Sequence, residues 1–122
     1  MSFNTEKCEV LGITNKRKGV TIIDYRIHGC VLRTVESAKY HGVTIAWRFS
    51  WKPHINNITK KANSTLGFLR RNLRKCPQKT RELAYCTYVR PTLEYASSVW
   101  DNNIKDQITR VERVQRRAAR FV

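Results

Sequence analysis

The sequence predicts an α+β protein in which short antiparallel β-strands, including a hairpin, precede a bundle of three helices. Residues 1–50 contain short, mostly apolar segments separated by polar turns. Residues 51–122 instead repeat apolar side chains at steps of three and four. The change of character near Trp51 therefore divides the 122-residue chain into a β-rich region, 1–50, and a basic helical region, 51–122. This length suits one small domain with a modest core.

The strands of the first region are predicted from composition and from turn signals. His28-Gly29 separates two apolar runs, a pattern typical of a tight hairpin. The segment 20–23 is β-branched throughout, which favours a strand, and a polar turn ending in Gly19 precedes it. The expected strands are residues 8–13, 20–23, 25–27, 30–32 and 40–45.

The first predicted helix begins after Ser50, whose hydroxyl can cap the helix N-terminus. Pro53 falls in its first turn, where the missing N–H costs little, and Cys76-Pro77 stops the helix. One apolar face is predicted from Ile55, Ile58, Ala62, Leu66, Leu69 and Leu73. The opposite face carries Lys60, Arg71 and Lys75.

The second predicted helix runs from about Gln78 to Trp100, with a kink or break at Pro91. Two apolar stripes lie side by side, so we expect this helix to be the buried centre of the bundle. The first stripe consists of Leu83, Cys86, Val89, Leu93, Ala96 and Trp100. The second consists of Tyr85, Tyr88, Tyr95 and Val99. Their helical spacing favours core packing of the aromatic rings over stacking on bases. Phe68 lies off the main stripe of the first helix, so the sequence is equally compatible with an exposed ring and with a packed one.

The third predicted helix follows a turn at residues 101–103 and runs from about Ile104 to the chain end. Its inward residues are expected to be Ile104, Ile108, Val111, Ala118 and Val122. Arg110, Arg113, Arg117 and Arg120 recur on another face, with Arg116 alongside. At about 1.5 Å per residue, this arginine ladder is about 15 Å long.

Charge is the strongest compositional feature of the chain. Lys and Arg total 24 against 9 acids, a net charge of +15, and residues 46–122 hold +12 of it. A compact domain with this charge repels itself unless a polyanion screens it. Nucleic acid is the commonest such polyanion and an anionic membrane surface the second, and we predict nucleic acid and no membrane as the partner. We expect an intracellular protein, nuclear or cytoplasmic, because the sequence has no membrane-spanning apolar run and no signal peptide.

The sequence offers little for catalysis or metal binding. Cys8, Cys30, Cys76 and Cys86 form no CxxC pair, and we expect reduced, mostly buried thiols. His54 has no cysteine or carboxylate at ligand spacing. There is no Gly-rich phosphate loop, no Ser/His/Asp set and no paired carboxylate of the kind that holds two metal ions in a polymerase.

Several segments, in order, resemble reverse transcriptases of non-LTR (LINE, jockey-like) retrotransposons. FNTEKC at residues 3–8 resembles the segment after the catalytic Asp-Asp strand, and YHGV at 40–43 resembles the primer grip. The strings beginning SWKPHI at 50, LGFLRRNL at 66, LEYASSVWD at 93 and VQRRAARF at 114 resemble the thumb and post-thumb region. Departures are His41 in place of leucine, residues 46–49 in place of a polar turn, and Asn102-Asn103 in place of proline and an aromatic residue or histidine.

The resemblance implies a late-palm, primer-grip and thumb portion of an RNA-directed DNA polymerase. It places Lys7 near an incoming nucleotide, and Tyr40, His41, Gly42 and Val43 at the primer 3′ end. The catalytic carboxylates, with the Mg²⁺ of the parent enzyme, would come from a palm strand upstream of Met1, so no cofactor and no polymerase activity are expected of this fragment alone. Met1 would then be an internal methionine of a truncated or degenerate element copy.

The predicted activity of the fragment is sequence-nonspecific binding of RNA, DNA or an RNA–DNA hybrid, because phosphate contacts carry no base information. The residues expected to carry it are Lys60, Arg71, Lys75, Arg110, Arg113, Arg117 and Arg120. In the parent protein, the missing palm would be a covalent partner. Two alternatives remain open: a stand-alone nucleic-acid-binding protein, and a helical module that pairs with another subunit.

Overall fold

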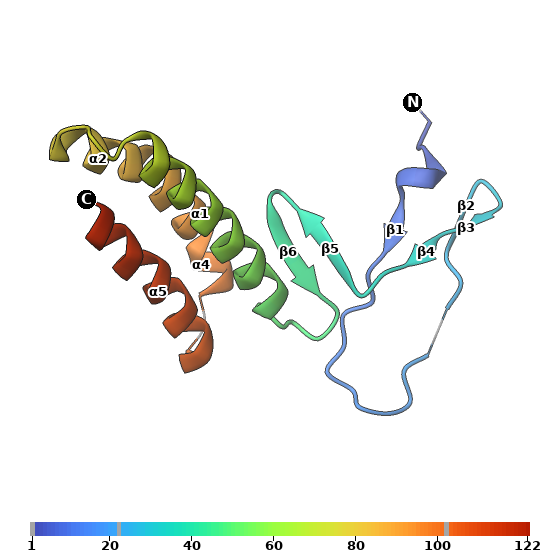
Figure 1. Cartoon of the computed structure of the whole chain (residues 1–122). Coiled ribbons are helices and arrows are strands. Elements are labelled where there is room, and N and C mark those ends of the chain that lie inside the picture. Colours follow the sequence, from blue (N-terminus) through green and yellow to red (C-terminus); the bar gives the residue numbers. More distant parts are fainter. Residues whose placement is uncertain (1, 22, 102) are drawn as a thin grey trace. The chain divides into compact units, whose positions relative to one another are not determined.

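The computed structural model describes residues 2–21, 23–101 and 103–122 and has an α+β fold (Figure 1). Short strand pairs occupy the N-terminal part, and helices occupy the rest. The chain divides into two compact units, Met1–Pro53 and His54–Val122. The predicted change of character at Trp51 lies close to this division.

The N-terminal unit consists of three separate two-stranded pairs. A 3₁₀ turn, η1 (Thr5–Lys7), leads into β1, which pairs with β4 in parallel, whereas β2 with β3 and β5 with β6 are antiparallel. The parallel pair differs from the predicted antiparallel strands. An ion pair joins it between Glu9 and Arg33, which face each other in register. The strands are β1 (Glu9–Val10), β2 (Arg26–Ile27), β3 (Cys30–Val31), β4 (Arg33–Thr34), β5 (Ser37–Tyr40) and β6 (Val43–Ala46).

Both antiparallel pairs turn at a His-Gly dipeptide. His28 and Gly29 have φ of 50° and 77°, and His41 and Gly42 have φ of 45° and 81°. Two central residues with positive φ make the two-residue loop whose twist matches that of the flanking strands. The predicted hairpin at His28-Gly29 is therefore confirmed. The predicted strand 40–45 is wrong, because residues 41 and 42 reverse the chain and separate β5 from β6.

Two further predicted strands are shorter than expected or absent. Of residues 8–13, only Glu9 and Val10 form a strand, and Val20, Thr21 and Ile23 lie in no strand. Ile22 lies outside the described residues. Val20 and Ile23 are exposed, so β-branched composition alone did not produce pairing where no neighbouring strand or core receives the side chains.

The first helix, α1 (Lys52–Asn72), begins as the sequence predicts. The Ser50 hydroxyl accepts a hydrogen bond of 3.4 Å from the backbone N–H of Lys52, and Pro53 lies in the first turn. The predicted apolar face is confirmed: its six members are buried or half-buried. The helix ends at Asn72, four residues before Cys76, in a turn closed by a hydrogen bond from the Cys76 N–H to the Leu73 carbonyl.

The predicted second helix is divided into four segments. The chain passes from α2 (Gln78–Ala84) through a π-helical turn, η2 (Tyr85–Val89), into α3 (Arg90–Glu94) and then α4 (Ser97–Trp100). The kink expected at Pro91 is present as the π-turn just before it, where the Arg90 N–H donates to the Tyr85 carbonyl. A further break follows at Ala96, whose φ of 52° ends regular helix geometry.

The π-turn explains why the predicted stripes of this segment are partly wrong. One extra residue per turn brings Ala84 and Val89, five positions apart, onto the same buried face, which Leu93 continues. Leu83, a member of the predicted stripe, is rotated outward. A regular 3.6-residue period assigns the wrong residues on either side of such a turn. The apolar residues left exposed are Leu83, Cys86, Tyr88, Tyr95 and Val99.

The last helix, α5 (Lys105–Phe121), lies parallel to α1 (Figure 1). Its buried residues are Gln107, Val114, Ala118 and Phe121, so the predictions of inward Ile104 and Ile108 are wrong, and both are exposed. Val111 and Val122 are half-buried against the core, and Ala118 is buried as predicted. Of the predicted turn at 101–103, Asn102 lies outside the described residues.

One hydrophobic core holds the helical unit together. It is formed by Ala62, Leu66, Leu69, Ala84, Val89, Leu93, Val114, Ala118 and Phe121. At the other end of the unit, His54 is buried with its ring 5.5 Å from that of Trp100, whose indole N–H donates to the Tyr95 carbonyl at 2.7 Å. Burial lowers the pKa of His54. Within the described parts of the chain, no helix has the length and apolarity needed to cross a membrane.

Candidate nucleic-acid interface

Three basic residues of α1, Lys60, Arg70 and Arg71, share one side of the helix. Their spacing along the sequence is close to whole helical turns. One line drawn along the helix surface therefore passes within about 60° of each of them and of Gly67. Arg74, in the turn that follows, extends the same face. The core face of α1 is fixed by its buried leucines, and the hydrophobic effect therefore also determines where these cations point.

Two asparagines of α1 fix the register of α5 beside it. A guanidinium N–H of Arg110 donates to the Asn56 side-chain carbonyl, and Arg117 donates likewise to Asn63 at 3.1 Å. Both bonds join residues that are 54 positions apart, and each helix advances seven residues between them. The two helices therefore run parallel with a constant offset, and their basic faces border the same groove.

The first part of this groove is a hollow of about 330 Å³, which we call the asparagine hollow. Arg110 also forms an ion pair with Asp106 at 3.3 Å, so part of its charge is compensated. Lys60 and Arg113 are exposed at its rim. The hollow is lined by Asn56, Thr59, Lys60, Asn63, Asp106, Arg110, Arg113, Val114 and Arg117.

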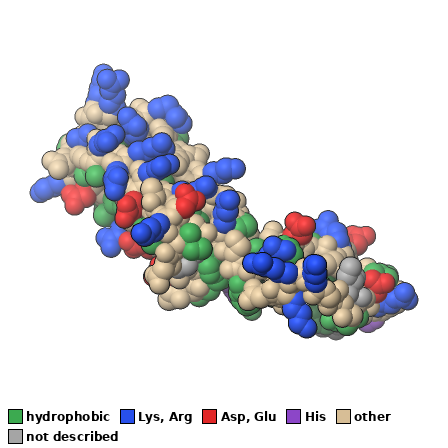
Figure 2. Space-filling model, turned by 90° about the horizontal axis from the view of Figure 1, so that it is seen from below, with side chains coloured by type: hydrophobic (Ala, Val, Ile, Leu, Met, Phe, Trp, Pro, Cys, Tyr) green, Lys and Arg blue, Asp and Glu red, His purple; other side chains and the backbone are tan. Residues whose placement is uncertain are grey.

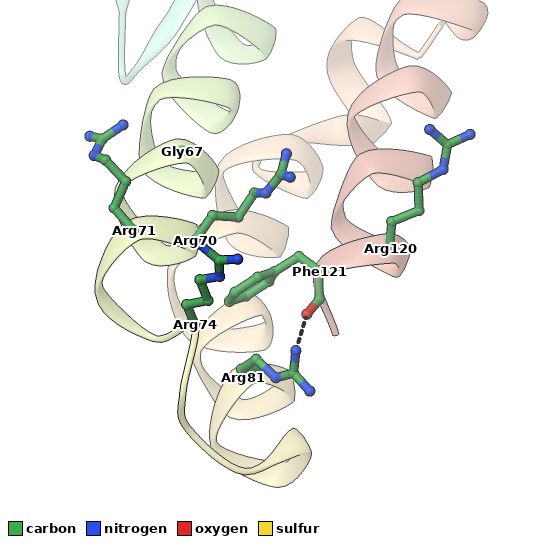
Figure 3. Close-up of a pocket in the computed structure, with 7 residues that line it drawn as sticks. All are labelled: Gly67, Arg70, Arg71, Arg74, Arg81, Arg120 and Phe121. Atoms are coloured by element: carbon green, nitrogen blue, oxygen red, sulfur yellow. Dashed lines mark hydrogen bonds between the residues drawn. The ribbon is translucent and has the colours of Figure 1, made fainter.

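The second part, of about 780 Å³, is the arginine hollow. Figure 3 shows Arg74 and Arg81 around Phe121, with Arg71 and Arg120 reaching outward on opposite flanks. Arg81 of α2 donates a hydrogen bond of 3.1 Å to the Phe121 carbonyl, which places a cation at the carbonyl end of α5. The hollow is lined by Gly67, Arg70, Arg71, Arg74, Arg81, Arg120 and Phe121.

Six of the seven cations predicted to bind nucleic acid line one of the two hollows. We call the cations of both hollows that lie along the two helices the α1–α5 lane; they are Lys60, Arg70, Arg71, Arg74, Arg110, Arg113, Arg117 and Arg120. Lys75 is exposed in the turn after α1 and lines neither hollow. Arg70, Arg74 and Arg81 are not among the predicted cations. The Arg70-Arg71 doublet with Arg74 one turn on was a readable signal, whereas Arg81 reaches the site only through tertiary packing.

Cations also occur outside the lane. Figure 2 shows Lys and Arg over much of the helical unit on the face it presents, with a few acidic side chains among them. Arg116 pairs with Glu112 at 3.1 Å, and Arg90 pairs with Glu94 at 2.8 Å, a hydrogen bond that raises the pKa of Arg90. These i, i+4 pairs neutralise part of the charge away from the lane.

The candidates in the N-terminal unit are exposed, except for Val43. Lys7 ends η1, and residues 40–43 form the tip of the β5–β6 hairpin, where Tyr40 and Val43 pair across the strands and His41 and Gly42 make the turn. Tyr40 and His41 meet edge to face with ring centroids 4.3 Å apart, and Val43 is buried. The hairpin thus presents an aromatic pair and the Gly42 backbone at its turn.

Several side chains expected in the core are at the surface. Tyr88 and Tyr95 are exposed, 60% and 56% respectively, whereas Trp100 is buried. Tyr85 is half-buried, and burial, the largest influence on this side chain, raises the pKa of its phenol. Phe68 is exposed.

The expectation of mostly buried thiols is also wrong. All four cysteines are free, but Cys30 and Cys86 are exposed, and Cys8 and Cys76 are half-buried. The two-residue strand β3 leaves Cys30 open, and the π-turn rotates Cys86 outward.

The fold and the grooved basic surface define an α+β protein with a cationic helical unit. Among the described residues, no group of three or more His, Cys, Asp or Glu side chains could hold a metal ion. The chain matches no protein-family model, and no curated protein or solved structure matches it.

Proposed function

We propose that the helical unit binds nucleic acid without sequence preference, in the manner of the thumb of a non-LTR retrotransposon reverse transcriptase. In this proposal the chain is the late-palm and thumb part of such an enzyme, with catalytic carboxylates and Mg²⁺ belonging to a separate palm segment. The fragment alone holds primer–template nucleic acid and does not polymerise it. Its intracellular setting follows from that role.

The observation that carries the proposal is the parallel alignment of two basic helices along one groove. Arginine and lysine ends from α1 and α5 border the groove for the length of the arginine ladder, about 15 Å. A duplex presents phosphates at regular intervals, and a row of long flexible cations can contact them in any sequence and in successive registers. This is the contact that a thumb requires while the primer advances.

The asparagine bonds support the proposal by ordering the lane. Arg110 and Arg117 are held across the groove by Asn56 and Asn63, while Lys60 and Arg113 are exposed beside them. Cations bonded to asparagines therefore alternate along the groove with exposed cations that are not bonded to them. The asparagine bonds set the distance between the helices, and Lys60 and Arg113 remain available to phosphates.

A salt titration of duplex binding tests the proposal. The full chain is titrated by fluorescence anisotropy into a labelled RNA–DNA hybrid with 5′-hydroxyl ends at several salt concentrations. With about five phosphates contacted, log K falls with log salt at a slope of about −4.5 for a B-form duplex. Affinity that is absent at low salt, or that does not change with salt, would overturn the proposal. Equal affinity for hybrids of unrelated sequence is also required.

A second candidate function is pairing with another protein subunit. The exposed side chains of Leu83, Tyr88, Tyr95 and Val99 favour it, because large apolar groups at the surface are typical of interaction sites. Heparin competition separates the two candidates: heparin displaces a phosphate-binding lane but not an apolar contact. A sedimentation mass that rises with protein concentration would favour the second candidate.

A further inference from the structure

The arginine hollow differs from the rest of the lane in the kind of charge it gathers. Five arginines line it, from α1, the turn after α1, α2 and α5, with the guanidinium groups of Arg71 and Arg120 at its outer flanks (Figure 3). None of its lining residues is acidic. The asparagine hollow contains Asp106 and ties two of its arginines to neighbouring side chains. The arginine hollow is thus the site of highest uncompensated positive charge among the two.

We propose that the arginine hollow is a binding site for a triphosphate group. A phosphodiester carries one charge per phosphate, whereas adjacent phosphoryl groups ending in a monoester-type phosphate concentrate several, about −2 on the terminal group alone. Five arginines around one hollow match that density. The guanidinium fork can also take two oxygens of one phosphoryl group at once, which a lysine cannot do.

Arg81 gives the hollow a fixed point. One of its terminal N–H groups is committed to the Phe121 carbonyl at 3.1 Å, which orients the guanidinium beside Phe121 (Figure 3). Its Nε is buried and has no hydrogen-bond partner among the described residues. A buried donor of a charged group without an acceptor is costly, and a phosphate oxygen reached by a small shift of this side chain would relieve that cost.

Gly67 makes room for the ligand. Glycine in the interior of a helix is unfavourable relative to alanine, so its place in the middle of α1 calls for a local reason. Here it lines the hollow together with Arg70 and Arg71 of the same helix. A Cβ at this position would lie 3.5 Å from the Arg71 guanidinium, an ordinary contact, but a longer side chain would extend into the hollow.

A triphosphate group has two sources, a free nucleoside triphosphate and the 5′ end of an RNA. The proposed site lies on the same basic surface as the proposed nucleic-acid binding and so rests on the proposed function. The ligand arms are therefore inorganic triphosphate, inorganic phosphate, ATP, and one RNA with either a 5′-triphosphate or a 5′-hydroxyl. Tighter binding of 5′-triphosphate RNA than of 5′-hydroxyl RNA assigns the RNA end. Binding of ATP without that difference assigns the free nucleotide.

The deciding variant fills the hollow and leaves the charge unchanged. In calorimetry on the full chain at matched ionic strength, Gly67→Gln is expected to weaken inorganic triphosphate binding about 10-fold or more, the loss of one strong contact. The slope of log K against log salt for duplex binding should stay unchanged, because the substitution removes no cation. Gly12→Gln is the matched control, since Gly12 lies in the N-terminal unit with open space around it. Circular dichroism verifies that α1 is intact.

A second variant keeps the inference testable if Gly67→Gln disturbs the helix. Arg70→Lys with Arg74→Lys preserves charge but removes two guanidinium forks, so triphosphate affinity should fall several-fold while the salt slope for duplex stays unchanged. Inorganic triphosphate that binds no tighter than inorganic phosphate would overturn the inference. Unchanged triphosphate affinity in a folded Gly67→Gln protein would do so as well. Neither result decides the proposed function, because duplex binding is measured in a separate salt titration.

Discussion

The two units of the chain are each stabilised by different interactions. The helical unit buries eleven hydrophobic side chains among the described residues, whereas the N-terminal unit buries Val43 and Ala46. The N-terminal unit depends more on hydrogen bonds, such as those from Val35 N–H to the Val10 carbonyl and from Thr14 N–H to the Trp47 carbonyl, each 2.9 Å. Isolated two-stranded pairs are marginally stable in water. The comparison implies that the helical unit folds around its own core and that the N-terminal unit contributes little to cooperative stability.

The largest expected effect is on the core of the helical unit. Leu66→Ala, at a side chain 2% exposed, removes packed methyl groups and should reduce the free energy of unfolding by about 2–5 kcal/mol. Val31→Ala, at a side chain 53% exposed in the N-terminal unit, should change it by less than about 0.5 kcal/mol. Urea unfolding followed by helical circular dichroism measures both. Similar losses of unfolding free energy for the two variants would contradict the conclusion that the helical unit provides most of the cooperative stability.

A smaller effect is expected at the β5–β6 turn. Gly42 has φ of 81°, which an alanine adopts at a cost of about 1–2 kcal/mol. Gly42→Ala should therefore loosen β5–β6 and speed amide exchange there, without moving the helical unfolding transition. Hydrogen exchange by mass spectrometry provides the readout, with Gly12→Ala as the control. A matching shift in the helical transition would mean that the two units unfold together.

The smallest effect concerns pH. Burial holds the pKa of His54 below 6.5, so the folded state keeps this ring neutral while the unfolded state gains a proton as pH falls. The stability of the helical unit should thus be complete above pH 6.5 and decrease as the pH drops from there toward the folded-state pKa. His54→Gln should flatten this dependence, and His28→Gln, at an exposed turn, should leave it intact. Urea midpoints at pH 7.5 and 5.5 test the difference; a greater stability of the native protein at the lower pH would refute it.

The sequence was most informative where a regular period met a core. The stripe of α1, its Pro53 start and the arginine ladder of α5 were all predictable, because a 3.6-residue repeat fixes which side chains share a face. The same reasoning failed between Leu83 and Tyr95, since one π-turn before Pro91 shifts the register by a residue. It also missed the division of the segment at Ala96, where a left-handed backbone conformation is set by the tertiary fold.

The candidate site shows the same limit. The sequence locates single cations on single helices, and Lys60, Arg113 and Arg120 were found in this way. Which helices lie side by side is decided by packing, so Asn63 as a bridge and Arg81 as a member of the hollow could not be predicted. The β-rich part was hardest, because strand propensity says nothing about which partner a segment finds.

The most direct test compares two sets of three cations that carry equal charge. Lys60→Gln, Arg113→Gln and Arg120→Gln remove exposed cations of the lane, and Lys16→Gln, Arg17→Gln and Lys18→Gln remove exposed cations of the N-terminal unit. If the lane holds the phosphates, the first set should make the slope of log K against log salt less negative by about 2.7, and the second should leave it unchanged. Equal changes from the two sets would show that net charge, and not the groove between α1 and α5, holds the nucleic acid.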